Sequence, residues 1–226
     1  MSEFKKTAAL EGIKLIKPGM SIGLGAGATI AYLVEALAAD SELARSLTLL
    51  SSSAETRSLL EESGFEVKSP GSFHQIDLYF DGCDQVDRHL DAFKSGAGIH
   101  TDEKILATMA TEFVILVDSG KLVDQLDATY PLVIEFIPES REKLLKDIRE
   151  MLSPQTITIR SEGDEPKKTS RNNLLADIKF HTLPALHELN AVKQKTGVIE
   201  HSLFFRIATR VIAAGPGGIE TITRRV

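Results

Sequence analysis

A short stretch of the sequence, residues 81–103, gathers the side chains that acid–base chemistry requires. Asp81 and Asp84 supply two carboxylates, Lys94 supplies a cation, and Glu103 supplies a further carboxylate. Proton abstraction beside a carbonyl needs a carboxylate base and a fixed cation or hydrogen-bond donor at the oxygen where negative charge develops. These residue types therefore fit such a reaction, provided that the chain folds Lys94 and Glu103 together.

The same residues also have structural interpretations. The helix dipole favours acids in a first helical turn, so Asp102 or Glu103 alone would be an ordinary stabilising surface charge. The three-residue spacing of Asp81, Asp84 and Asp87 fits a solvated rim or a weak divalent-ion site. It lacks the alternate-residue spacing of a calcium loop, and none of the six histidines lies at zinc-ligand spacing. The residues alone leave these interpretations open.

The hydrophobic pattern around this stretch predicts the elements that position it. Residues 76–80 alternate as a strand does, so Asp81 lies at a strand end, where open α/β sheets bind ligands. Gly96 and Gly98 give the loop after Lys94 backbone angles that other residues avoid. A helix is predicted to begin near Thr101. Its expected inner face consists of Ile105, Leu106, Met109 and Ala110.

A glycine-rich turn near the N-terminus is the second candidate site. It joins a strand predicted at residues 20–23 to a helix predicted at residues 29–39. The turn residues are Gly25, Ala26, Gly27, Ala28 and Thr29. A strand, a glycine turn and a helix together point backbone N–H groups and the positive helix end at an anion, for which phosphate is the natural candidate. A dinucleotide fingerprint is the alternative, but the next strand ends in Ser51, not in the acid that would bind a ribose.

The alternation of strands and helices over the first half predicts a parallel sheet covered by helices. Four strand ends, near Gly25, Ser51, Asp81 and Asp118, are expected to face the same crevice. Lys121 follows the last of them. It is either a surface cation or a side chain that reaches a phosphate at the glycine turn.

The pattern changes after residue 127. The predicted elements are a strand at 131–137, a helix at 139–152, strands at 156–160 and 174–180, a helix at 184–195 and a strand at 198–207. This order is typical of a ferredoxin-like unit, and the tail at 209–214 is expected to return to the first sheet. The predicted class is α/β, with a Rossmann-like parallel-sheet domain at residues 1–129 and 208–226. An inserted ferredoxin-like α+β domain is predicted at residues 130–207.

Composition limits the classes of function. With 226 residues, 42% of them hydrophobic, the chain can bury a substantial core. A net charge of −6 with scattered Lys and Arg provides neither a basic stripe for nucleic acid nor a polybasic membrane patch. Cys83 is the single cysteine and fits a reducing compartment; its thiol between two acids is expected to resist ionisation. No apolar signal region follows Lys5 and Lys6, so a cytoplasmic protein is expected, with small molecules or its own copies as partners.

The order of these motifs resembles that of a known family. The motifs are Gly-x-Gly-x-Gly-x-Thr, Ser-Ser-Ser, Asp-Gly-x-Asp, Lys-x-Gly-x-Gly with a Glu nine residues after the Lys, and Asp-x-x-Lys. Together they resemble ribose-5-phosphate isomerase of the A type over nearly the whole chain. The resemblance implies the interconversion of ribose 5-phosphate and ribulose 5-phosphate, in the pentose phosphate pathway, through an enediolate and without metal or cofactor. It also implies a homodimer or homotetramer.

The resemblance further implies a role for each site residue. Glu103 would move a proton between C2 and C1, Lys94 would stabilise the enediolate oxygen, and Asp81 with Asp84 would assist ring opening and proton exchange. A closed pocket is expected to raise the pKa of the base toward neutrality. The substrate-binding residues would be Gly25, Ala26, Gly27, Ala28, Thr29, Ser51, Gly96, Gly98 and Lys121.

The sequence departs from the family pattern at several positions. Ala26 and Ala28 stand where the family usually has Thr and Ser, so two hydroxyl donors are missing from the phosphate turn. Gln85 replaces a Glu, and Ser95 and Ala97 replace glycines. Two rival functions stay open: an isomerase of another sugar phosphate, and a sensing module that binds a sugar phosphate without converting it. A sugar-responsive repressor would need a DNA-reading helix, and no basic helix of that kind precedes residue 20.

Overall fold

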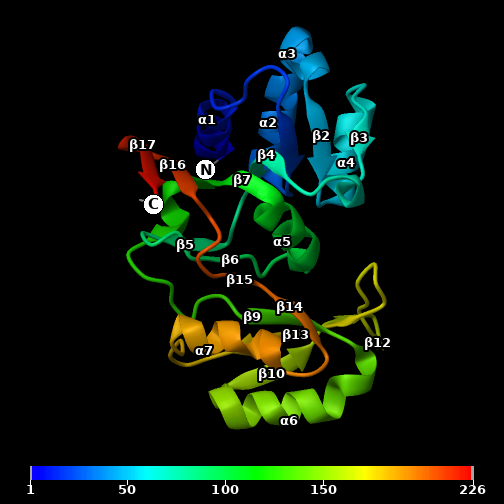
Figure 1. Cartoon of the computed structure of the whole chain (residues 1–226). Helices are drawn as coiled ribbons and strands as arrows, with labels where there is room; N and C mark the ends of the chain where they lie inside the picture. The colour runs from blue at the N-terminus through cyan, green and yellow to red at the C-terminus, as the bar shows by residue number, and fades with distance from the viewer. Residues whose placement is uncertain (1, 225–226) are drawn as a thin grey trace.

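The structure of the chain, a computed structural model, describes residues 2–224 and contains a large sheet, a small middle sheet and a lower sheet (Figure 1). In spatial order the large sheet consists of β17 (Gly218–Thr223), β16 (Arg210–Gly215), β7 (Ala110–Asp118), β4 (Ile76–Asp81), β1 (Ser21–Leu24), β2 (Thr48–Ser51) and β3 (Val67–Lys68). The predicted α/β class is confirmed. The tail also returns as predicted, because β16 pairs in parallel with β7, while β17 adds an antiparallel strand that was not predicted.

The parallel strands of the large sheet end at one edge. β1 pairs with β2 and β4, and β4 pairs with β7, all in parallel. Leu24 therefore lies opposite both Ser51 and Phe80, next to Asp81 at the end of β4. The predicted convergence of the strand ends is confirmed.

Helices cover both faces of the large sheet. On one face, α1 (Ser2–Ile13), α2 (Ala28–Ala39) and α4 (Ala54–Glu62) supply apolar side chains such as Leu33 and Leu60, which pack in one cluster with Phe80. On the other face, α5 (His100–Met109) inserts Leu106 into a cluster with Phe113. A short helix that was not predicted, α3 (Ser41–Ser46), follows α2 and is capped by the side chain of Asp40. Within residues 2–224, every helix is too short or too polar to cross a bilayer.

The inner face predicted for α5 is partly wrong. Ile105 is 40% exposed, and Ala110 already belongs to β7. The buried side chains of the helix include Glu103 and Lys104, together with His100 at its first position. The helix lies between the large and lower sheets, and its polar side chains are buried there against other polar groups.

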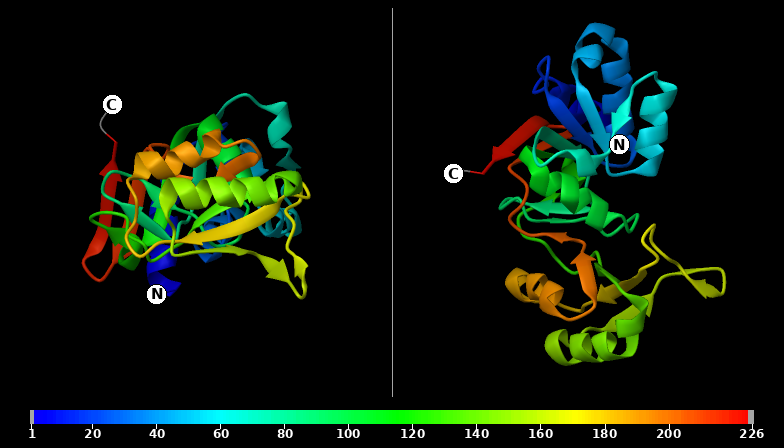
Figure 2. Two further views of the ribbon diagram at one scale, coloured as in Figure 1. Left: turned by 90° about the horizontal axis from the view of Figure 1, so that it is seen from below. Right: turned by 45° about the vertical axis from the view of Figure 1, so that its right-hand side comes forward.

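The lower sheet has the ferredoxin-like arrangement that the sequence predicted. In spatial order its strands are β10 (Thr156–Ile159), β13 (Leu174–Lys179), β9 (Leu132–Phe136) and β14 (Val198–His201), and all neighbours are antiparallel. Helices α6 (Arg141–Leu152) and α7 (Leu186–Asn190) cover the face turned away from the large sheet (Figure 2). The helix predicted at 184–195 continues beyond α7 only as a 3-10 turn. The domain boundaries after residues 129 and 207 stay a prediction.

The strand predicted at 198–207 is divided between two sheets. Its first part is β14, whereas β15 (Leu203–Phe204) joins the middle sheet with β5 (Gln85–Asp87), β6 (Ala92–Phe93) and β8 (Leu122–Val123). Ser202 makes the transition, because its N–H donates to the Val133 carbonyl in β9 and its carbonyl accepts from the N–H of Lys94. The backbone of Lys94 is thereby joined to the chain that leaves the lower sheet.

Candidate active site

A cavity of about 270 Å³ lies where the strands of the large sheet end. Its lining includes most of the predicted site residues: Ala26, Gly27, Ala28, Thr29, Asp84, Lys94, Gly96, Glu103 and Lys121. Lys5 from α1 and Glu55 from α4 also line it, and neither was predicted. No local pattern marks these two, since only the packing of α1 and α4 around the sheet brings them to the cavity.

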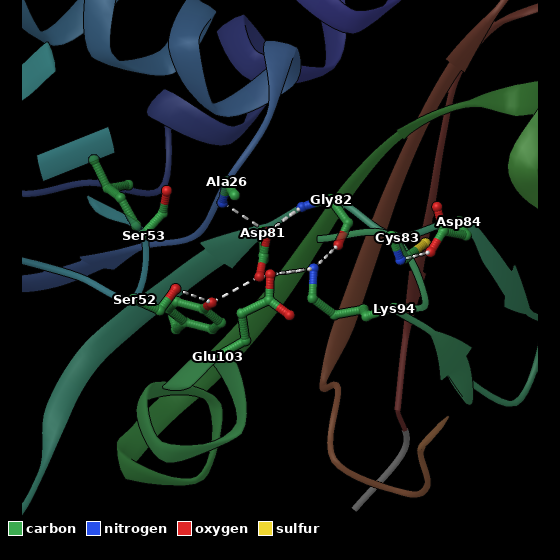
Figure 3. Close-up of polar contacts among 12 residues, drawn as sticks. Ala26, Ser52, Ser53, Asp81, Gly82, Cys83, Asp84, Lys94 and Glu103 are labelled. Carbon is green, nitrogen blue, oxygen red and sulfur yellow. Dashed lines mark hydrogen bonds and ion pairs between the residues drawn. The ribbon is translucent and has the colours of Figure 1, made fainter. Parts of the chain in front are cut away.

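The two residues most needed for proton abstraction meet in this cavity. The ammonium Nζ of Lys94 lies 3.3 Å from Oε1 of Glu103 and 2.8 Å from Oδ2 of Asp81, and it donates to the Gly82 carbonyl at 2.6 Å (Figure 3). Lys94 arrives from the end of β6 and Glu103 from the first turn of α5. The folding condition set by the sequence is therefore met.

Asp81 is fully buried and does not line the cavity. Its carboxylate has no exposed surface and accepts hydrogen bonds from the N–H groups of Gly82 and Ala26 and from the Tyr79 hydroxyl, at 2.8, 3.2 and 2.7 Å. A Cβ atom on Gly25 would lie 2.0 Å from the carboxyl carbon, so only glycine fits there. Together with the Lys94 ammonium, these donors surround the Asp81 carboxylate.

Asp84 anchors the start of the 95–99 loop, which consists of residues 95–99 after Lys94. Its Oδ2 accepts from the N–H of Ser95 at 2.6 Å and from the N–H of Gly96 at 3.1 Å. Among the described residues, no hydrogen bond engages its Oδ1. Asp84 is half-buried and lines the cavity, so this oxygen is available to a ligand.

Burial sets the electrostatics of Glu103 and Lys94. Glu103 is 4% exposed, and its burial raises the pKa of its carboxyl to about 8 although Lys94 opposes the shift. Burial alone would lower the pKa of Lys94, but the carboxylates of Asp81 and Glu103 raise it above its ordinary value. The site thus holds a permanent cation beside a carboxyl group that titrates close to neutrality, as a general base should.

The glycine turn forms another part of the cavity wall. Helix α2 begins there with Gly27 as its N-cap, and no side chain caps it within the described residues. The N-terminal end of a helix attracts anions. Lys121 donates to the Cys83 carbonyl at 2.6 Å and adds a cation to the lining of the same cavity.

Some predicted binding residues do not line the cavity. The Ser51 hydroxyl donates to the carbonyl oxygens of Leu24 and Ser53, both at 3.0 Å, and so shapes the turn. Gly25 contacts Asp81, and Gly98 packs against the lower sheet.

Two further residues near the site have structural roles. Cys83 resists ionisation, as expected, but the main cause is burial, which raises the pKa of its thiol to about 12. The Asp87 carboxylate accepts from the N–H groups of His89 and Asp91 in a turn. The three acids at 81, 84 and 87 therefore bind separate sets of donors.

Comparison with known proteins identifies the family. Residues 48–218 match the family described as ribose 5-phosphate isomerase A (phosphoriboisomerase A). The ribose-5-phosphate isomerase A of Lactobacillus acidophilus is 34% identical, over 95% of this chain and 93% of its own length. That of Methanosarcina acetivorans is 30% identical, over 98% and 94%.

Solved structures similar to this chain indicate the same family. A D-ribose-5-phosphate isomerase in complex with phospho-erythronic acid has a TM-score of 0.90 and 30% identity, with 98% of each chain covered. The ribose 5-phosphate isomerase A of Methanocaldococcus jannaschii has a TM-score of 0.88 and 29% identity, over 98% of this chain and 99% of its own. The chain therefore belongs to the ribose-5-phosphate isomerase A family.

Proposed function

We propose that this protein interconverts ribose 5-phosphate and ribulose 5-phosphate by proton transfer through an enediolate. The observation that supports this most strongly is the meeting of Lys94 and Glu103 at 3.3 Å in a cavity that the anion-attracting N-terminal end of α2 also lines. Membership of the family supports the same reaction. The related structure that contains phospho-erythronic acid supports a phosphorylated sugar as the ligand class.

The geometry suggests a role for each group. Glu103 removes the proton from C2 of the open-chain aldose, and the C2–H electron pair forms the C1–C2 double bond while the carbonyl π pair moves onto the C1 oxygen. Lys94 stabilises the negative charge on that oxygen. Glu103 then returns its proton to C1, and Asp84, through Oδ1, exchanges protons with the sugar oxygens so that the C2 hydroxyl becomes the ketone. Asp81 acts as a positioning residue, because it contacts Lys94 and lies outside the cavity lining.

An assay with the purified protein tests this proposal. With a metal chelator present, we expect ketose to form from ribose 5-phosphate, with a higher kcat/KM than from other aldose phosphates or from unphosphorylated ribose. Preferred conversion of a different sugar phosphate would instead support the isomerase of altered specificity. Binding of ribose 5-phosphate without any turnover would support the sensing module.

Two cavity residues of opposite charge should change phosphate affinity in opposite directions. Lys121→Ala removes a cation from the cavity that the glycine turn lines and should raise KM for ribose 5-phosphate about tenfold, with a smaller change in kcat. Glu55→Gln removes a carboxylate that repels the phosphate and should lower KM several-fold. Glu62→Gln, an exposed residue at the end of α4, is the matched control. Steady-state kinetics of the three variants measure these changes; equal KM values would place the phosphate elsewhere.

The assembly and location of the protein are part of the same proposal. We infer a cytoplasmic homodimer or homotetramer. The family resemblance supports the assembly, and the single cysteine supports a reducing compartment. Light scattering of the purified protein measures the assembly directly.

A further inference from the structure

The 95–99 loop lies against the lower sheet, between the two residues proposed to carry the reaction. Lys94 precedes the loop, and Glu103 follows it in the first turn of α5. The lower sheet is a separate structure below the large sheet (Figure 1), and the reaction steps proposed above assign it no part. Its contacts with the loop nevertheless involve buried or half-buried polar groups at several points.

Arg160, directly after β10, makes the most extensive of these contacts. Its Nη2 donates to the carbonyl of Ser95, its Nη1 donates to the carbonyl of Gly96 at 2.8 Å, and its Nε donates to Oδ1 of Asp177 at 2.7 Å. The side chain is only 17% exposed. A planar guanidinium held by a carboxylate on one edge presents its other donors in a fixed direction, so the two loop carbonyls are held in place.

The contact continues to Asp84 through a single peptide group. The Ser95 carbonyl that accepts from Arg160 and the Gly96 N–H that donates to Asp84 belong to the same peptide unit. Because a peptide unit is planar and rigid, holding its carbonyl on one side directs its N–H on the other. Arg160 therefore sets the direction of a donor that orients the Asp84 carboxylate in the cavity.

The loop also packs closely on the lower sheet. Gly98 has a φ of +78°, and a Cβ atom there would lie 2.5 Å from Cδ1 of Leu175 and 3.1 Å from Nη1 of Arg160. Glycine is thus required both by the backbone angle and by the close approach. Gly96 and Ala97 on the same loop line the cavity, so the loop forms part of the cavity wall.

The start of α5 is held by a second buried group of the lower sheet. Glu135 in β9 is 1% exposed and accepts from the hydroxyls of Thr101 and Thr169 and from the side-chain amide of Asn173. Thr101 lies two residues before Glu103. Both ends of the segment from Lys94 to Glu103 are therefore bonded to the lower sheet or to the chain that leaves it.

We propose that the lower sheet serves as a positioning element for catalysis, with Arg160 as its principal positioning residue and Glu135 as the second. Arg160 holds the Ser95–Gly96 peptide unit and thereby Asp84, while Glu135 holds the helix turn that carries Glu103. Neither side chain lines the cavity. The inference rests on the proposed isomerase function, since its effect is measured on that reaction.

Kinetics of Arg160→Ala test the inference. Displacing a reacting group by about 1 Å can reduce the rate by about a hundredfold, so we expect kcat to fall tenfold to a hundredfold with a smaller change in KM. Arg149→Ala, an exposed arginine on α6 of the same unit, is the matched control and should keep the parent kcat and KM. Free guanidinium ion should restore part of the rate of Arg160→Ala and leave that of Arg149→Ala unchanged.

The pH profile and a double variant separate positioning from a general loss of structure. A loosened loop admits water to Glu103, so the acid limb of kcat/KM should move to lower pH in Arg160→Ala. If Arg160 acts through Asp84, then Asp84→Asn combined with Arg160→Ala should have about the kcat of Asp84→Asn alone. Additive losses would overturn the route through Asp84.

Milder variants keep the test decisive if Arg160→Ala fails to fold. Arg160→Lys retains one cationic donor, and Asp177→Asn leaves the guanidinium in place but loosely held, so both should show part of the loss in kcat. A folded Arg160→Ala or Arg160→Lys with the parent kcat and pH profile would overturn the inference. Absence of isomerase activity in the parent protein would instead contradict the proposed function.

Discussion

Glu103→Gln is expected to lower kcat for ribose 5-phosphate by about 10³-fold and to leave KM nearly unchanged, since general-base catalysis typically contributes factors of about 10² to 10⁴. Glutamine keeps the size and the hydrogen-bonding capacity of the side chain beside Lys94, but it cannot accept the C2 proton. Asp102→Asn is the matched control, because Asp102 is the neighbouring acid of the same helix turn and forms a partly exposed pair with Arg171. Turnover of Glu103→Gln at the parent rate would remove Glu103 from its proposed role.

The pH dependence of the reaction provides a second measurement on Glu103. The base must be ionised, and its pKa in the free protein is about 8. Below that value kcat/KM should fall about tenfold for each pH unit, because the ionised fraction falls by that factor. A profile without a group titrating on the acid side would contradict the assignment. This fall of kcat/KM at acid pH should be absent from any residual activity of Glu103→Gln.

The stability of the fold should change with pH in the direction opposite to kcat/KM: it should fall as the pH rises. The carboxyl of Glu103 has a higher pKa in the folded chain, about 8, than its ordinary value of 4.5. Its protonated form thus stabilises the fold fully below pH 4.5, and this contribution is lost as the pH rises through 8. Between these limits the parent protein should lose a few kcal/mol of unfolding free energy relative to Glu103→Gln. Chemical denaturation of both proteins at several pH values measures the difference.

Local sequence patterns predicted the central pair because both residues lie within one short stretch. Strand periodicity placed Asp81 at a sheet edge, and the glycines after Lys94 indicated a loop that returns the chain to Glu103. The same patterns predicted the inner face of α5 only in part. Leu106 and Met109 pack in the core as predicted, but Ile105 is exposed, and Glu103 and Lys104 are buried among polar partners that periodicity does not register. Alternation also could not show that residues 198–207 divide at Ser202, because the division is made by backbone hydrogen bonds to two different sheets.

Local sequence patterns could not predict the residues that reach the site from distant segments of the chain. Lys5 and Glu55 reach the cavity only because α1 and α4 pack around the large sheet. Arg160 reaches the 95–99 loop, and Glu135 reaches α5, only because the inserted unit folds beneath them. Each looks like an ordinary charged residue in its own segment, so its role depends on long-range packing that no local spacing encodes.

Lys94→Met is expected to impair both stability and catalysis. Asp81 has no exposed surface and lies 2.8 Å from the Lys94 ammonium, so methionine leaves a buried carboxylate without its counter-charge. Removing one partner of a buried pair typically costs about 3–5 kcal/mol, which corresponds to a fall in Tm on the order of 10 °C for a chain of this length. The activity should fall about 10²- to 10³-fold, because the enediolate oxygen loses its cation.

A double variant separates the two effects. In Lys94→Met with Asp81→Asn the buried charge is removed as well. The amide oxygen of asparagine can still accept from the N–H groups of Gly82 and Ala26, and its NH2 group can donate to the Tyr79 hydroxyl oxygen. We therefore expect most of the lost Tm to return and kcat to stay at the level of Lys94→Met. Scanning calorimetry and steady-state kinetics of the single and double variants measure both quantities. If kcat recovered together with Tm, Lys94 would act only as the counter-charge of Asp81, and the enediolate would need another source of stabilisation.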